Sequence, residues 1–461
     1  MALAQGIAWG LGDAPHAVAR SEDWSGVSRE GIVARLVIRR EILWRERRSA
    51  RERDAGSVGR AVTAPEQARI DGETDPAFAA VREAFVSNFS ERRELGAALC
   101  VKLGGRTVVD LWGGHADVAK TRPWTRDTLV NAYSVGKGIL AMLVMAVVER
   151  GELDLDAPVA QRWPEFAAAG KEKLSLRTLL CHSVGLPSVR ARLPESALYD
   201  WDAMTRALAS QAPWWEPGIA HGYHVNTYGF LAGELVRRAT GWPVGEALAR
   251  LVTGPAEAEF WYGLPRSEHA RVAEVDAPQV ALTTEAQWAA AFPQTGDALR
   301  DRMIWHCYFN PSGLSGIGTV NTPEWRLATI PSTNGHGTAR AVATLYAAFL
   351  EGGPPVAPWA GEALRREATT IHADGEDRVL GRPTRFGLGF QLTQENRPIG
   401  PGRSSFGHYG YGGSLGFADP EAGLAFGYLM NRPGDRWQNP RTQQLIDAVY
   451  DSLGMHDRNR S

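Results

Sequence analysis

The chain has 461 residues, of which 44% are hydrophobic and 22% charged, and its 50 basic and 52 acidic residues give a formal net charge of −2. This composition excludes a disordered or collagen-like chain. The balanced charge argues against a nucleic-acid partner or a general affinity for anionic membranes.

Residues 1–62 differ in composition from the rest of the chain, because they are rich in arginine. We expect them to form a peripheral extension outside the folded domain. They show no basic region followed by an apolar stretch, so we predict no signal peptide and a cytoplasmic location. The longest apolar run, residues 139–148, is too short for the roughly 20 residues that a membrane-spanning helix needs.

Strand patterns lie at both ends of the remaining chain, and helical patterns lie between them. The terminal elements are a helix at 75–89, strands at 96–103, 107–112, 415–417 and 424–430, and a closing helix at 444–453. This order predicts an α/β protein of the α+β type, in which one antiparallel sheet is built from the N- and C-terminal segments, is flanked by helices, and carries a large, mainly helical insertion. The predicted domain spans 63–455, with a sheet part at 63–129 and 381–455, a helical part at 130–380 and a tail at 456–461.

A serine and a lysine stand three residues apart at the start of the apolar run. Ser134 and Lys137 precede residues 139–148, and Gly151 follows as a helix stop, which predicts a helix buried on all sides. Side chains three apart share one helix face, so the Lys137 amine can reach the Ser134 hydroxyl. Burial lowers the pKa of a lysine and lets it accept the proton that a serine must lose to become a nucleophile. Only five lysines occur in the chain, so the pairing is informative.

Two further segments carry sequence motifs that belong with Ser134-x-x-Lys137. Residues 217–229 contain a Tyr-x-Val-Asn sequence before a helix, and residues 406–417 form a glycine-rich strand. Together with Ser134-x-x-Lys137 and the loop at 179–187, they resemble the serine β-lactamase and penicillin-binding-protein superfamily, most closely the class C β-lactamase-like carboxylesterases called family VIII. The resemblance covers about residues 66–455.

The resemblance implies a role for each matching position. Ser134 would be the acylated nucleophile, Lys137 its partner, and Tyr223 the base whose phenolate also activates the deacylating water. The N–H groups of Ser134 and Tyr411 would form the oxyanion hole. The strand that replaces a Lys-Thr-Gly motif would bind substrate through His408, Tyr409 and Gly410.

Two departures from the superfamily's pattern bear on the substrate. A cationic residue that would grip a substrate carboxylate is replaced by His408, and Val225 stands where an asparagine would hold a substrate amide, with Asn226 one place late. Both changes favour a small uncharged ester as the substrate.

The sequence contains two other patterns that can indicate a catalytic or metal site. Residues 412–416 also match the G-x-S-x-G elbow around Ser414, but a strand and a turn follow where the elbow needs a helix. His221 and His224 lack further ligands at a useful spacing, and the three cysteines form no CxxC pair, so we expect no metal and no cofactor.

Three functions follow from these observations. The first is a serine hydrolase, a carboxylesterase that forms an acyl-enzyme on Ser134. The second is a β-lactamase, DD-peptidase or other amide hydrolase at the same site, and the third is a non-catalytic, penicillin-binding-like ligand-binding domain. The expected partner is a small-molecule ester, and the sequence is compatible with a monomer or a homo-oligomer.

Overall fold

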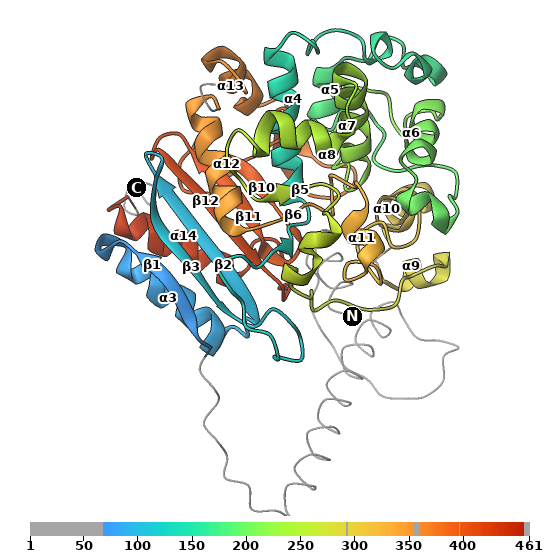
Figure 1. Cartoon of the computed structure of the whole chain (residues 1–461). Helices are drawn as coiled ribbons and strands as arrows, with labels where there is room; N and C mark the ends of the chain where they lie inside the picture. Colours follow the sequence, from blue (N-terminus) through green and yellow to red (C-terminus); the bar gives the residue numbers. More distant parts are fainter. Residues whose placement is uncertain (1–67, 292–293, 354–358, 396, 456–461) are drawn as a thin grey trace, which may run out of the picture. The chain divides into compact units, whose positions relative to one another are not determined.

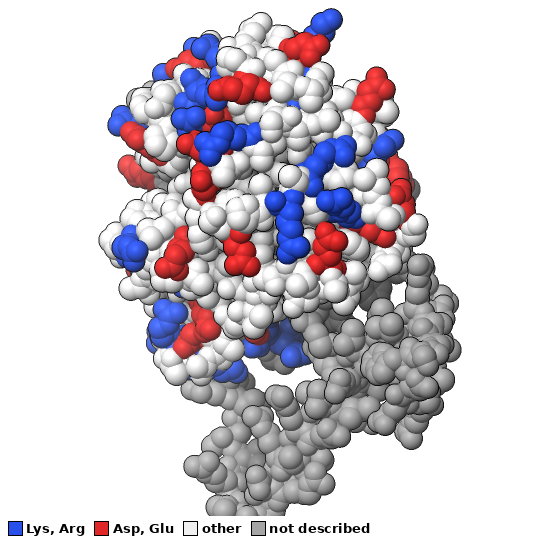
Figure 2. All heavy atoms as spheres, turned by 90° about the vertical axis from the view of Figure 1, so that its right-hand side faces the viewer, with Lys and Arg blue, Asp and Glu red and all other residues white. Residues whose placement is uncertain are grey.

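A computed structural model describes residues 68–291, 294–353, 359–395 and 397–455. The predicted extension at 1–62 and the tail at 456–461 therefore lie outside the described residues. Within the described residues, no helix is both long and apolar enough to cross a membrane. On the face seen in Figure 2, acidic and basic side chains are interspersed and separated by uncharged surface.

Both ends of the described chain join one antiparallel sheet, as predicted. Its nine strands run in the order β1-β3-β2-β12-β11-β10-β9-β8-β7. The two ends meet where β2 pairs with β12, from Leu103 opposite Leu424 to Ala97 opposite Met430. The strands are β1 (Ile70–Thr74), β2 (Gly96–Leu103), β3 (Arg106–Gly114), β7 (Ala373–Glu376), β8 (Pro383–Phe386), β9 (Gln391–Leu392), β10 (Phe406–Tyr409), β11 (Leu415–Asp419) and β12 (Leu424–Met430).

The sheet begins earlier in its C-terminal part than the predicted boundary at 381. Strand β7 at Ala373–Glu376 pairs with β8 at the edge of the sheet. Its sequence, Ala-Asp-Gly-Glu, shows no alternation of apolar and polar residues. An edge strand with charged side chains buries little surface, so it does not need such a pattern. The signal for a strand is therefore missing from the sequence.

Helices cover both faces of the sheet (Figure 1). Helices α3 (Ala79–Glu91) and α14 (Pro440–Ser452) pack on one face, where Phe85, Phe417 and Tyr450 share a core cluster. Helix α12 (Ala339–Glu351) packs on the other face, against β2, β11 and β12.

The insertion is mainly helical, as predicted. Its helices are α4 (Val135–Glu149), α5 (Leu176–Leu180), α6 (Trp201–Ser210), α7 (Thr227–Thr240), α8 (Val244–Leu248), α9 (Glu285–Ala291), α10 (Ala298–Phe309), α11 (Pro323–Leu327) and α13 (Glu362–Thr369). A small sheet in the order β4-β6-β5 also lies there, from Val130–Asn131, His336–Gly337 and Phe260–Trp261.

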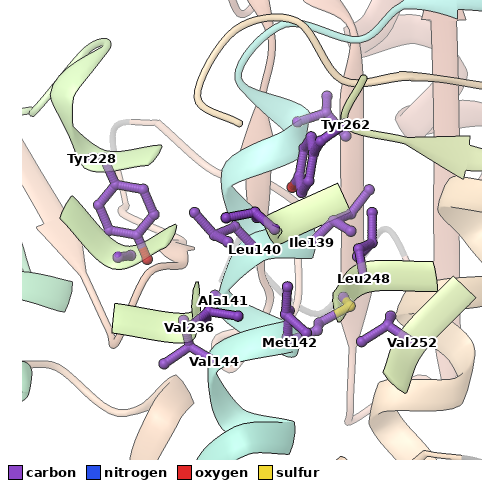
Figure 3. Close-up of a cluster of buried hydrophobic side chains, with 14 of the residues drawn as sticks. Ile139, Leu140, Ala141, Met142, Val144, Tyr228, Val236, Leu248, Val252 and Tyr262 are labelled. Atoms are coloured by element: carbon purple, nitrogen blue, oxygen red, sulfur yellow. The ribbon is translucent and has the colours of Figure 1, made fainter. Parts of the chain in front are cut away.

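Helix α4 runs through the centre of the core. Every residue from Val135 to Val147 is buried. Figure 3 shows its apolar side chains packed among residues of α7, α8 and the segments that follow α8. Each such side chain contributes about 1.5–3 kcal/mol when it is fully buried. Gly138 is required, because a Cβ there would lie 2.2 Å from the Tyr346 hydroxyl oxygen. The start of α4 therefore packs closely against Tyr346 of α12.

Candidate active site

Ser134 caps the N-terminus of α4 and is the accessible residue at the start of a buried helix. Its neighbour Tyr133 has a φ of 50°, in the left-handed region that a tyrosine rarely adopts. Such backbone strain persists only where the surroundings impose it, and it is frequent at functional sites. Ser134 is partly exposed, whereas the residues on both sides of it are buried.

Lys137 lies directly beneath Ser134. Its Nζ donates to Ser134 Oγ at 3.0 Å and to the carbonyl oxygen of Ser332 at 2.9 Å. The side chain is fully buried, and within the described residues no carboxylate lies within ion-pair distance of it. Burial therefore lowers the pKa of Lys137 well below its usual value. A neutral amine at hydrogen-bond distance from a hydroxyl can accept its proton.

Tyr223 comes to the same point from the irregular loop between α6 and α7. The Lys137 Nζ lies 4.9 Å from the centre of the Tyr223 ring. Burial raises the pKa of Tyr223 well above its usual value, and a hydrogen bond with Ser134 opposes that rise. The phenol is therefore protonated at neutral pH and adjoins the serine. The structure thus brings together the three residues for which the sequence predicts catalysis.

His408 lies on the other side of Tyr223, at 3.5 Å from its hydroxyl oxygen through Nε2. Its Nδ1 is 2.7 Å from the carbonyl oxygen of Tyr409, which can only accept a hydrogen bond, so Nδ1 carries the proton and Nε2 a lone pair. Burial and the nearby Lys137 hold the pKa of His408 well below its usual range. The imidazole is neutral, and it offers no positive charge to a substrate carboxylate.

Gly410 and Tyr411 approach the start of α4 closely. A Cβ at Gly410 would lie 2.6 Å from the Ala132 carbonyl oxygen and 3.3 Å from Val135. The Tyr411 ring packs edge-on against Tyr133, at 5.3 Å between ring centres. In the described part of the chain, the backbone N–H groups of Ser134 and Tyr411 donate to no acceptor. An oxyanion hole formed by these two N–H groups stays a prediction.

Tyr409 does not join the site through its side chain. Neighbouring residues of a strand point to opposite faces of the sheet, and His408 faces α4. The Tyr409 side chain packs instead with Leu415, Phe417 and Tyr450 in the core on the opposite face. The prediction that Tyr409 binds substrate is therefore wrong for its side chain, because strand alternation separates it from His408.

Three residues beside Tyr223 were not predicted. Phe386 of β8 stacks on the Tyr223 ring at 5.9 Å, and Trp437 meets it edge-on at 5.6 Å. The carboxylate of Asp377 accepts the Tyr223 N–H. Each belongs to a segment far away in the sequence, and no local pattern links these segments to the Tyr223 loop.

The departures noted in the sequence have structural counterparts. Asn226 turns away from the serine, because its amide donates to the Cys307 carbonyl and to Ser315. Val225 is buried in the aromatic cluster around Tyr223.

The alternative sites do not assemble in the structure. Ser414 is completely buried and leads into strand β11, so it does not stand on a nucleophile elbow. His221 and His224 bond to Thr384 and to the Gly222 carbonyl, respectively. Among the described residues, no cluster of three metal-ligating side chains occurs.

The chain is similar in sequence to several known proteins. The family model described as beta-lactamase matches residues 78–450. Esterase/beta-lactamase LipL of Mycobacterium tuberculosis is 34% identical over 368 residues, which cover 79% of this chain and 83% of LipL. Esterase EstB of Burkholderia gladioli is 37% identical over 182 residues, covering 36% of this chain and 46% of EstB.

Two solved structures resemble the whole described domain. A crystal structure of a family VIII carboxylesterase has a TM-score of 0.75 and 36% identity, and the match covers 84% of this chain and all of that one. A penicillin-binding protein homolog from Caulobacter crescentus has a TM-score of 0.75 and 37% identity, with the same coverage. The chain belongs to the β-lactamase family.

Proposed function

We propose that the protein is a carboxylesterase that hydrolyses small uncharged esters through an acyl-enzyme on Ser134. The observation that carries this proposal is the buried Lys137, whose Nζ lies 3.0 Å from the Ser134 hydroxyl oxygen. Relatives named as esterases and the match to a family VIII carboxylesterase support the reaction class.

Acylation begins with transfer of the Ser134 proton to the Lys137 amine, as Ser134 Oγ attacks the ester carbonyl carbon. The N–H groups of Ser134 and Tyr411 stabilise the resulting oxyanion. When the intermediate collapses, the alkoxide leaves with the Tyr223 hydroxyl proton, and the Lys137 ammonium returns a proton to Tyr223. This order differs from the phenolate base that the resemblance implies, because burial keeps Tyr223 protonated.

Deacylation uses the same groups in reverse. Lys137, relayed by Tyr223, accepts a proton from water as the water oxygen attacks the acyl carbon. Ser134 Oγ leaves and recovers its proton, which releases the carboxylic acid. His408 accepts a hydrogen bond from the Tyr223 hydroxyl through Nε2 and so orients it.

The neutral His408 favours an uncharged ester over a carboxylated β-lactam or peptide. The test compares steady-state hydrolysis of 4-nitrophenyl butyrate with that of a chromogenic cephalosporin and a D-Ala-D-Ala peptide. We expect the ester to have the highest kcat/KM and the Ser134→Ala variant to lose all activity. Faster cephalosporin or peptide turnover would instead favour a β-lactamase or DD-peptidase. Binding of these compounds without any turnover would favour a non-catalytic domain.

A further inference from the structure

Tyr223 stands in a loop that cannot hold it in place by itself. Residues 211–226 form no helix or strand, so their backbone groups need partners from elsewhere. Some of the partners come from the loop at residues 182–185, where the His182 carbonyl accepts the Gly222 N–H and His182 Nδ1 accepts the His224 N–H. The partners of Tyr223 itself come from the hairpin of β7 and β8, far later in the chain. From β8, Phe386 stacks on the Tyr223 ring. From the turn of the hairpin, Asp377 reaches the Tyr223 backbone.

Asp377 is a completely buried carboxylate surrounded by donors. Both of its oxygens lie 3.0 Å from the Tyr223 nitrogen. It also accepts the N–H groups of Val379 and Leu380, each at 2.9 Å, and the hydroxyl of Thr384 at 3.0 Å. The Tyr223, Val379 and Leu380 N–H groups can only donate, so the Asp377 oxygens accept from all three, and these bonds oppose the rise in the pKa of Asp377 that burial causes.

A histidine lies behind this carboxylate. Thr384 gives its only hydroxyl proton to Asp377, so its oxygen accepts from His221 Nε2 at 2.8 Å. The His221 carbonyl in turn accepts the Arg378 N–H from the hairpin turn. The chain His221, Thr384 and Asp377 therefore ties the loop to the hairpin at His221 and at the Tyr223 N–H.

We infer that Asp377 is the positioning residue for Tyr223, fixing the phenol between Lys137, Ser134 and His408 through the Tyr223 N–H. This inference rests on the proposed function of Tyr223. Asp377 does not touch the substrate. A displacement of about 1 Å in a catalytic group can reduce turnover by about 10². Loss of this carboxylate should consequently slow the chemistry more than it weakens substrate binding.

The test compares Asp377→Asn with Asp419→Asn. Asp419 is also completely buried and caps a hairpin turn, with the Glu421 N–H at 2.9 Å and the Tyr450 hydroxyl at 2.6 Å, but on the α14 side of the sheet. An asparagine at 377 keeps one oxygen for the Val379 and Leu380 N–H groups but places an NH₂ group, which cannot accept, against the Tyr223 N–H and the Thr384 hydroxyl. We expect Asp377→Asn to lower kcat for 4-nitrophenyl butyrate by about 10² with KM changed less than about threefold. Asp419→Asn should lower the unfolding midpoint and leave kcat unchanged.

A second pair of variants applies if Asp377→Asn does not fold. Thr384→Val removes the hydroxyl that bridges Asp377 and His221, whereas Thr384→Ser keeps it. We expect the valine variant to lose kcat and the serine variant to recover it. Equal kcat in both variants, or a normal kcat in Asp377→Asn, would overturn the inference.

The labelling rate of Ser134 by a fluorophosphonate separates this inference from the proposed function. It reports on activation of the serine whether or not esters are turned over. Slower labelling in Asp377→Asn than in Asp419→Asn supports the positioning role even if ester turnover is absent. Equal labelling rates contradict it even if the protein is an active esterase.

Discussion

Replacing Lys137 by methionine tests the protonation state on which the proposed mechanism depends. Methionine has a similar length and no charge, so it can fill the same buried space. The substitution removes the donor to Ser134 and leaves the Ser332 carbonyl without its bond from Nζ. We expect kcat to fall by at least about 10³, as when one member of a nucleophile and base unit is removed.

Although Lys137→Met should lower kcat, we do not expect it to lower the free energy of unfolding. An unpaired buried carbonyl costs about 1–3 kcal/mol. Against this, burial lowers the pKa of Lys137 in the folded protein, whereas an unfolded lysine keeps a pKa of about 10.4. Burial therefore disfavours the charged lysine in the folded protein, and each unit by which the folded pKa lies below the unfolded one costs up to about 1.4 kcal/mol while the unfolded lysine is protonated. Lys137→Met lacks this cost, so we expect it to be at least as stable as the wild type at pH 7.

The pH dependence gives a sharper test. Between the folded and unfolded pKa values of Lys137, the unfolded chain binds one more proton than the native protein. Wild-type stability therefore gains from rising pH, by up to about 1.4 kcal/mol per pH unit. The other titrating groups are common to both proteins, so the difference between wild type and Lys137→Met isolates this slope.

The assay is urea unfolding of both proteins at pH 7, 8 and 9, followed by the fluorescence of the 16 tryptophans. The wild type should become steadily more stable relative to Lys137→Met as the pH rises. A difference that does not change with pH would mean that Lys137 is protonated in the folded protein. That result, or a kcat of Lys137→Met within tenfold of wild type, would contradict the role of Lys137 as a neutral base.

Four further predictions follow from the structure. Tyr223→Phe should lower kcat by about 10²–10⁴ and hardly change the unfolding midpoint, because the hydroxyl serves proton transfer rather than packing. Gly138→Ala should destabilise the fold by about 1–3 kcal/mol in urea unfolding, and adding Tyr346→Phe should restore part of the loss, since the new Cβ meets the Tyr346 hydroxyl oxygen. Ser414→Ala should leave kcat unchanged, because the serine is fully buried; loss of activity would revive the elbow hypothesis. Deleting residues 1–62 should leave kcat and the unfolding midpoint unchanged, and aggregation of the truncated protein would show that the domain begins earlier.

The sequence predicts the elements whose signals are local. The Gly104-Gly105 pair predicts the β2–β3 hairpin, and the two glycines have φ values of 52° and 74° in its turn. The apolar run before Gly151 is the buried helix α4. Strand β7 is missed, because an edge strand of four residues with two acidic side chains buries too little to leave a pattern.

The same distinction applies to the site. Ser134 and Lys137 are predictable because their spacing places them on one helix face. Tyr223 and His408 come from the resemblance, and their contact is a product of the tertiary fold. Asp377 was not predicted, because only the tertiary fold brings its carboxylate to the Tyr223 N–H. Tyr409 is misassigned, because membership of a motif does not tell which face of the strand a side chain takes.

Intact-protein mass spectrometry can detect the proposed acyl-enzyme on Ser134 itself. The wild type is mixed with 4-nitrophenyl butyrate, quenched in acid within milliseconds to seconds, weighed, and digested to locate the adduct. We expect a mass increase of one butyryl group on the peptide that carries Ser134, and none in Ser134→Ala. An adduct on another residue, or ester hydrolysis that persists in Ser134→Ala, would contradict it.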